Sequence, residues 1–302
     1  MSKLKDNKKM LGGFAVAAAY VMWGFLTLFW NLLTEVNPVY ILAQRIIWSM
    51  VFMGIYIAVI GGISEIKEIF KDRHTLLICF ICGVLVTINW GVYIYAVNSS
   101  HVLDASLGYF IEPVLVGLIG LIAFKEKLST LEKITYIFAA AGLVYMVVRT
   151  GVFPILSIVI AGSFAVYGAV KKNLSITPQA SLFMETLFMT LPAIIFTVFA
   201  ETHGMGSTGV ISGWKMLLLP ACGIVTSIPL LLFNIGVKKI PYYFSGILMY
   251  INPTIQFFMG TFYYHEPLNK DRLISFIFIW VGILFTIADK IIQSKKEKSF
   301  EK

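Results

Sequence analysis

The chain has 302 residues, of which 58% are hydrophobic and only 13% are charged. Soluble domains carry about 25% charged residues, so this composition excludes an ordinary soluble domain and indicates a membrane protein. A formal net charge of +8 is also common in nucleic-acid-binding proteins. The placement of the basic residues indicates instead that the positive charge sets the orientation of the chain in a membrane.

Ten apolar segments, each close to the roughly 20 residues that cross a bilayer core, can be drawn along the chain. They cover residues 11–33, 38–60, 74–98, 102–124, 130–149, 153–172, 178–200, 214–237, 241–263 and 271–292. We therefore expect an all-α, multi-pass membrane protein with ten transmembrane helices. No cleavable signal peptide is predicted, because the basic N-terminus leads straight into a full-length span.

The basic residues are unevenly divided between the two sides of such a bundle. If both termini are cytoplasmic, the outer side contains Arg149, Lys215, Lys270 and Arg272, and Arg45 lies inside a span. The rest of the 24 Lys and Arg residues then fall on the cytoplasmic side, as the positive-inside rule requires. We therefore expect both termini to be cytoplasmic. We interpret these residues as topology determinants with a secondary affinity for anionic lipids, and we expect no nucleic-acid partner.

The first two predicted spans contain the first intramembrane charge. The span over 11–33 carries the run WGFLTLFW, with Tyr20 just before it. The span over 38–60 contains QRIIWS, which places Arg45 well inside the apolar segment. A charge at the bilayer centre costs at least about 2.5–3.5 kcal/mol on insertion scales. We therefore expect Arg45 to face protein or a water-filled cavity.

After a polar, basic loop over 61–73, the span over 74–98 combines two cysteines with amide and aromatic side chains. Cys79 and Cys82 form a C-x-x-C pattern without a second pair. We interpret both as small buried hydrophobic residues, with a metal or redox site as the minor alternative. The polar and aromatic residues of this span are Asn89, Trp90, Tyr93 and Asn98.

The span over 102–124 carries an acid beside a proline. Glu112 precedes Pro113 in an otherwise apolar run, and a proline inside a membrane helix frees a carbonyl group and interrupts the helical ladder. No basic residue lies one turn from Glu112, and an unpaired buried carboxylate resists ionisation. We expect Glu112 to carry an exchangeable proton at neutral pH; the alternative is a hydrogen-bonding group that stabilises the kink. Glu126 is expected to tie a short hairpin to a neighbouring helix end.

The second half of the chain repeats these features at an offset of about 140 residues. Ile111, Pro113, Glu126 and Leu128 align with Ile251, Pro253, Glu266 and Leu268, and Gly142 aligns with Gly282. We expect two repeats, over 1–150 and 151–302, with five spans each. Because five is odd, the repeats must be inverted, and a pair of interrupted helices at matching positions indicates a transporter's binding site.

Arg45 and Glu185 also align at this offset, each inside an apolar span. They are expected to recognise a charged substrate or to form a switchable pair. The alternatives are a permanent structural ion pair and contacts to freed backbone carbonyls.

The candidate cavity residues are amides, aromatic residues and charges predicted at mid-membrane depth. They are Arg45, Asn89, Trp90, Tyr93, Asn98, Tyr109, Glu112, Tyr167, Glu185, Tyr250 and Asn252, around helix breaks at Pro113 and Pro253. Apolar walls with a few polar groups suit a small amphipathic ligand. The alternative is aromatic belts or hydrogen bonds between helices, and the belt interpretation is preferred for Tyr20 and Tyr264.

Catalytic chemistry is poorly supported. The sequence lacks H-E-x-x-H, G-x-S-x-G and G-x-x-x-x-G-K-[ST] patterns, and its four histidines form no cluster. We expect no enzyme, cofactor, metal or nucleotide-binding domain. Two alternatives stay open: an intramembrane enzyme acting on a lipid, which needs clustered acids or a nucleophile, and an assembly subunit without transport, which needs large soluble loops.

Several runs resemble the RarD branch of the EamA family, in the drug/metabolite transporter superfamily. They are WGFLTLFW, QRIIWS, NWGVYIYAVNSSHVLDASLGYFIEP, FKEKL, FAVYGAVKK, METLFMTLPA and GIVTSIPLLLF. The resemblance implies a ten-helix carrier in the bacterial cytoplasmic (inner) membrane, with a central cavity for small molecules. Glu112 departs from the asparagine usual in that family.

On this basis we expect a secondary active transporter, a permease or exporter of small organic metabolites or drugs, that works by alternating access. Its expected partners are a small-molecule substrate, protons and membrane lipids. It is expected to act as a monomer or homodimer.

Overall fold

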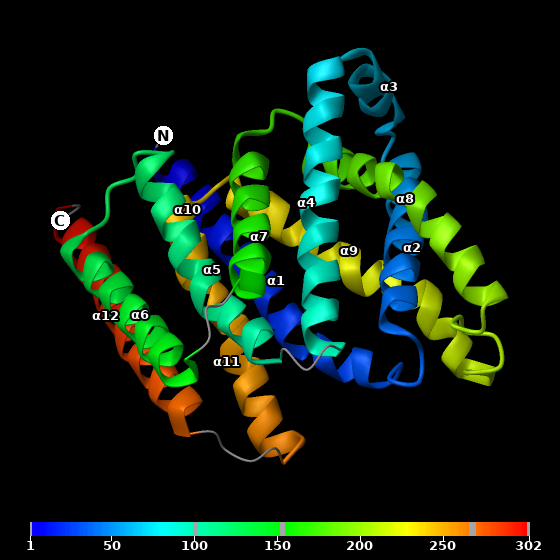
Figure 1. The fold of residues 1–302 in the computed structure, drawn as a ribbon. Coiled ribbons are helices and arrows are strands. Elements are labelled where there is room, and N and C mark those ends of the chain that lie inside the picture. Colours follow the sequence, from blue (N-terminus) through cyan, green and yellow to red (C-terminus); the bar gives the residue numbers. More distant parts are fainter. Residues whose placement is uncertain (1, 99–101, 152–154, 266–269, 301–302) are drawn as a thin grey trace.

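The computed structural model describes residues 2–98, 102–151, 155–265 and 270–300, and these residues contain helices and no strand. The helices form one bundle in which the two termini lie at the same end (Figure 1). We call this the terminal end, and the other the far end.

The described residues of the first half form six helices, which are α1 (Ser2–Asn31), α2 (Pro38–Val59), α3 (Ile63–Lys71), α4 (Arg73–Asn98), α5 (Val102–Ile122) and α6 (Thr130–Thr150). Local signals set several of these ends. The Asn37 side chain accepts hydrogen bonds from the backbone N–H groups of Val39 and Tyr40, and so caps α2. Ser129 and Glu132 form a reciprocal capping box at the start of α6.

The second half forms α7 (Ile155–Asn173), α8 (Pro178–Thr202), a 3₁₀ turn (Gly213–Leu217) that runs into α9 (Leu218–Val237), α10 (Tyr242–Met249), α11 (Ile251–Phe258), a π-helical turn (Met259–Tyr263) and α12 (Lys270–Phe300). Within the described residues, eight helices are long and apolar enough to cross a membrane. They are α1, α2, α4, α6, α7, α8, α9 with its 3₁₀ turn, and α12. A shorter apolar helix, Leu107–Ile122, lies within α5.

Two expectations about local structure need correction. Residues 61–73, expected as a loop, contain α3, because isoleucines three residues apart give this segment an apolar face; Ile66 and Ile69 are buried. A helix break was expected at Pro113, but α5 continues through it. A proline removes only one backbone hydrogen bond, which the rest of a long helix can tolerate.

The equivalent helix in the second half is interrupted. It divides into α10 and α11 at Tyr250, three residues before Pro253. Pro253 has no N–H to offer the carbonyl of Met249, and the backbone N–H of Tyr250 bonds to Ile247 at 3.3 Å in a tighter, 3₁₀-like turn. The break expected at Pro253 is therefore present.

The helices pack in pairs that bring the two halves of the chain together. α6 packs on α12 at one edge of the bundle, and α2 packs on α8 and α9 on the other side (Figure 1). Between them, α5 contacts α7 and α10, α4 contacts α7 and α8, and α1 contacts α9 and α11. The largest buried cluster lies among these inner helices and includes Tyr20, Phe164, Tyr167, Phe233 and Tyr242.

Candidate functional site

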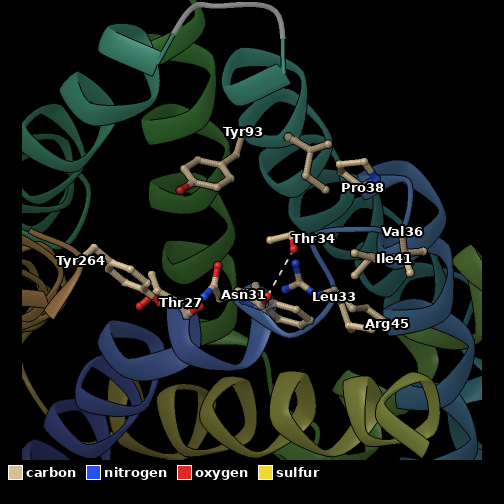
Figure 2. A pocket seen from close by; sticks show the side chains of 12 residues that line it. Thr27, Asn31, Leu33, Thr34, Val36, Pro38, Ile41, Arg45, Tyr93 and Tyr264 are labelled. Carbon is tan, nitrogen blue, oxygen red and sulfur yellow. Dashed lines mark hydrogen bonds between the residues drawn. The ribbon is translucent and has the colours of Figure 1, made fainter. Parts of the chain in front are cut away.

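A pocket of about 610 Å³ lies at the far end of the bundle, where α1 ends and α2 begins (Figure 2). We call it the outer pocket. It is lined by Thr27, Trp30, Asn31, Leu33, Thr34, Val36, Pro38, Ile41, Arg45, Tyr93, Ile94 and Tyr264. Asn31 and Thr34 are exposed, so the pocket is accessible from the far end.

A second cavity, of about 150 Å³, continues the outer pocket into the middle of the bundle. The two share Thr27, Trp30, Arg45 and Tyr93, so together they form one tract. The inner part is also lined by Tyr20, Trp23, Leu26, Asn89, Trp90, Tyr109, Glu112, Ile160, Phe164, Met249, Asn252 and Gln256.

Arg45 lies where the outer pocket meets the inner cavity. Its guanidinium carbon is 4.7 Å from the ring centre of Trp30 on α1 and 4.2 Å from that of Trp90 on α4. Its Nε donates a hydrogen bond to the Thr226 hydroxyl on α9 at 3.1 Å. Four helices thus fix the position of this cation, although no carboxylate among the described residues lies within 4 Å of it.

Glu112 lies at the inner end of the tract, on α5. Its side chain is buried, with 8% exposure, and it forms no hydrogen bond or ion pair with the described residues. The Tyr20 hydroxyl, which lines the same cavity, is buried and has no hydrogen-bond partner in the described part of the chain. A carboxyl group and a phenol hydroxyl are therefore both available to a ligand, water or proton there.

The amide groups beside Glu112 are partly engaged. Asn89 donates its side-chain N–H to the carbonyl of Ile160 at 2.7 Å, which ties α4 to α7. Gln256 donates to the side-chain oxygen of Asn252 at 2.9 Å, on the same face of α11. These bonds hold the amide side chains in fixed orientations at the cavity wall.

The side chains of α1 that form one wall of the tract were not among the candidate residues proposed from the sequence. Tyr20, Trp23, Thr27 and Trp30 follow one another at intervals of three or four residues, so they share one side of the helix. All four line the inner cavity. This spacing was visible in the sequence, and it is the signal that would have identified them.

The belt interpretation of Tyr20 is wrong. Tyr20 is 2% exposed and packs inside the main buried cluster. Tyr264 lines the outer pocket, and its hydroxyl donates to the carbonyl of Thr27 at 3.4 Å. Tyr20 lies in the middle of the span over 11–33, where neighbouring helices cover it. Tyr264 is half-buried at the far end, and its assignment to an aromatic belt stays a prediction.

The structure contains no pair between Arg45 and Glu185. Glu185 accepts hydrogen bonds from Lys171, from Ser181 at 2.7 Å and from Tyr167 at 3.1 Å. Lys171 is fully buried and Glu185 is 1% exposed. Sequence reasoning placed Lys171 among the basic residues of the cytoplasmic edge, and so missed it as the partner of Glu185.

The candidate residues predicted from the sequence lie in three places within the described part of the chain. Those lining the tract are Arg45, Asn89, Trp90, Tyr93, Tyr109, Glu112 and Asn252. Tyr167 and Glu185 belong instead to the buried network with Lys171, and Tyr250 packs among Phe110, Phe257 and Phe276. The side chain of Asn98 lies outside the described part, as does Glu266.

Polar contacts join the two halves at the terminal end, beside a pocket of about 470 Å³ among the ends of α4, α5 and α7. This pocket shares no lining residue with the tract. Glu126, after α5, accepts hydrogen bonds from the backbone N–H groups of Tyr242 and Tyr243 at 2.7 and 2.9 Å. These N–H groups begin α10, where a carboxylate is favourable. The Lys172 ammonium, at the end of α7, lies 3.6 Å from Glu126. Glu126 thus joins two helix ends, as expected.

Cysteine chemistry has little support in the structure. Cys79 and Cys82 are buried and free, which agrees with their interpretation as small hydrophobic residues. Within the described ranges, no group of three or more His, Cys, Asp or Glu side chains could hold a metal ion.

These features define a multi-pass helical membrane protein with a metabolite-sized tract whose apolar and aromatic walls carry a few polar groups. The chain belongs to the EamA-like transporter family, whose sequence model matches it twice, over residues 10–148 and 152–288. The resemblance to the RarD branch is confirmed by the relatives described next.

Two relatives cover nearly the whole chain. The "Uncharacterized transporter YojE" of Bacillus subtilis (strain 168) is 37% identical, over 97% of this chain and 98% of its own. "Protein RarD" of Escherichia coli (strain K12) is 32% identical, over 96% of this chain and 99% of its own.

A more distant relative is the "Chloramphenicol-sensitive protein RarD" of Pseudomonas aeruginosa, 23% identical over 89% of this chain and 91% of its own. A crystal structure of another protein covers 93% of this chain and 96% of its own, with a TM-score of 0.70 and 17% identity. That likeness shows a shared fold.

Proposed function

We propose that this protein is a secondary active transporter of small organic molecules in the bacterial cytoplasmic membrane. The observation that carries the proposal is the tract, which begins at the far end of the bundle, stops at Glu112, and is separated from the terminal end by packed residues and the Glu126 contacts. An alternating-access carrier needs such a one-sided cavity. Names that describe relatives as transporters support the same function.

The pattern of helix contacts supports two inverted five-helix repeats. In the proposed correspondence, α1 pairs with α7, α2 with α8, α4 with α9, α5 with α10–α11, and α6 with α12. If each helix is replaced by the other member of its pair, the contact between α1 and α9 corresponds to that between α7 and α4. The contact between α2 and α9 corresponds in the same way to that between α8 and α4, and all four contacts are present. The contact between α5 and α7 corresponds to the contacts that α1 makes with α10 and α11. The contact between α6 and α12 corresponds to itself, because these two helices form one pair. In this arrangement α5 and α10–α11 are the remaining two of ten spans.

The bias of the basic residues supports a bundle whose terminal end is cytoplasmic. Lys171 no longer contributes to that bias, since it is fully buried, but the remaining basic residues keep its direction. With this orientation the tract opens to the outside of the cell. Alternating access would then close the far end and open the terminal end around Glu112.

Glu112 is the proposed proton-coupling group. The alternative role, stabilising the kink at Pro113 by a hydrogen bond, lacks support because Glu112 forms no hydrogen bond with the described residues. In a cavity closed to water, an unpaired carboxyl group favours its protonated form, and it can release the proton when the cavity opens. Protonation and conformation are linked in this way.

An intramembrane enzyme finds less support. Such an enzyme needs paired acids or a nucleophile beside a base, and Glu112 is the sole carboxylate among the described residues that line the tract.

The test of the proposal uses purified protein in proteoliposomes. A metabolite and drug panel is first screened for thermal stabilisation, since a ligand that binds only the folded state raises its stability. Stabilising compounds are then tested for uptake with and without an imposed pH gradient. We expect accumulation by the parent protein, and in Glu112→Gln we expect loss of gradient-driven accumulation with substrate exchange retained.

The control variant is Glu68→Gln, which removes an exposed carboxyl group of α3 that lies outside the tract and should keep gradient-driven uptake. Accumulation by Glu112→Gln equal to that of the parent would show that Glu112 is not the coupling group. No flux of any stabilising compound would contradict transport itself.

A further inference from the structure

We infer that the tract selects organic anions, and that Arg45 binds the carboxylate of the transported molecule. This inference rests on the proposed transport function and assigns its substrate class. The ligand it describes is a small carboxylate with an apolar or aromatic body.

The charge of Arg45 is not balanced by a carboxylate among the described residues. A guanidinium inside a membrane bundle is costly unless an anion or water satisfies it. Glu185, at the equivalent position of the second half, has a buried partner in Lys171. Arg45 has no such partner among the described residues, and Glu112, which shares the inner cavity, forms no ion pair with it. A mobile anion would supply the missing charge.

Two indole rings and one hydroxyl group hold the guanidinium of Arg45. Trp30 and Trp90 stabilise its charge through their ring electrons without neutralising it. Thr226 occupies the Nε–H, which leaves the terminal NH₂ groups as donors at a site that faces the pocket. Two N–H groups of an arginine match the two oxygens of a carboxylate.

The outer pocket lies next to Arg45. Trp30, Leu33, Ile41, Tyr93 and Ile94 give the outer pocket apolar and aromatic walls. Its volume of about 610 Å³ is in the range of small-molecule sites. Polar groups occur on one wall, at Thr27, Asn31 and Thr34 (Figure 2). A fully hydrated inorganic ion would leave these apolar walls uncovered, whereas an aryl or alkyl carboxylate would cover them.

The test compares matched acids, amides and amines with purified protein in detergent. The probes are phenylacetate, 3-phenylpropionate and 4-phenylbutyrate, their primary amides, and phenethylammonium. Binding is followed by intrinsic tryptophan fluorescence, since Trp30 and Trp90 flank the site, and by the thermal unfolding midpoint. We expect saturable binding of at least one acid, with its amide and the amine at least about tenfold weaker.

Variants then locate the site. Arg45→Gln should abolish acid binding, and Arg45→Lys should weaken it by about tenfold, because an ammonium cannot form the two-pronged contact. Lys215→Gln is the matched control: Lys215 carries the same charge at the far end but pairs with Glu35 at 2.9 Å, and its loss should leave binding unchanged. The acid-to-amide ratio of the parent protein is a second measurement that does not depend on how well Arg45→Gln folds.

Three outcomes would overturn the inference: amides that bind as tightly as acids, acid binding unchanged in folded Arg45→Gln, or equal competition by chloride or inorganic phosphate, which would indicate a simple ion site. Failure of the anion assignment can be told apart from failure of the proposed transport function. Flux of amides or amines with no acid binding would keep transport and reject the anion assignment. Arg45-dependent acid binding without flux in proteoliposomes would keep the anion site and reject transport.

Discussion

Arg45 and Glu185 lie 140 residues apart, align in the proposed repeats and meet different surroundings. Arg45 lies between two indole rings at a cavity, whereas Glu185 and Lys171 are both buried. Asn234 extends this second network by donating to the Tyr167 hydroxyl at 3.1 Å. The guanidinium of Arg45 thus remains available to a ligand, whereas Lys171 neutralises the carboxylate of Glu185 inside the protein.

The Lys171–Glu185 pair should behave as a buried unit. We expect Lys171→Met and Glu185→Gln each to lower the free energy of unfolding by about 3–5 kcal/mol, because each leaves an uncompensated buried group. The double variant should lose clearly less than the sum of the two. Unfolding of the four proteins in detergent gives the coupling energy.

The exposed pair Lys215–Glu35 is the control for this cycle. Its coupling should be under about 1 kcal/mol, since solvent screens partly exposed ion pairs. Strict additivity of the Lys171 and Glu185 changes would contradict the network. A cycle between Arg45 and Glu185, by contrast, should be additive, because the two side chains do not touch.

At the scale of helices, α6 and α12 form an interface in which equivalent residues make equivalent contacts. A Cβ on Gly142 would lie 3.0 Å from the carbonyl oxygen of Ser275. A Cβ on Gly282 would lie 3.0 Å from that of Thr135. The Thr135 hydroxyl also donates to the carbonyl of Gly282 at 2.6 Å. Small residues allow this close approach, which is how membrane helices gain packing energy.

Enlarging either glycine should separate the two helices. We expect Gly142→Val and Gly282→Val to lower the thermal unfolding midpoint by similar amounts, because each places methyl groups against backbone of the facing helix. Gly162→Val on α7 is the control, since a Cβ there meets nothing within 4 Å, and it should change the midpoint little. An equal loss in all three variants would indicate a general effect of β-branched residues rather than this interface.

At the scale of the whole molecule, the proposed orientation follows from charge and repeat number. Thr208, between α8 and α9, and Lys67, on α3, are both exposed, and they lie at the far end and the terminal end respectively. Their solvent exposure is therefore matched, and only the side of the membrane differs.

This difference can be measured with an impermeant thiol reagent on intact cells. In a background without Cys79, Cys82 and Cys222, we expect Thr208→Cys to be labelled from outside and Lys67→Cys to be labelled only after permeabilisation. The opposite pattern would reverse the orientation, and the tract would then open toward the cytoplasm.

The sequence by itself determined the class of protein and the positions of most helices. Hydropathy is a property of about 20 neighbouring residues, and caps such as Asn37 and Ser129 act within one turn, so both can be read locally. The same local signals identified Arg45, Asn89 and Glu112, because polar groups inside apolar runs need a cavity or partner. The periodic apolar face of α3 was also readable, although the segment was predicted as a loop.

Only the tertiary structure decided which partner each of these side chains has. Lys171 and Glu185 meet because α7 and α8 present these faces to each other, and nothing within one turn of either residue specifies that contact. Tyr20 is buried for the same reason, since α9 and neighbouring helices cover its side of α1. Arg45 keeps its charge available because Trp30, Trp90 and Thr226, from three other helices, surround it without a carboxylate. Partner choice depends on which helix faces come together, and that is set by the packing of the whole bundle rather than by any one segment.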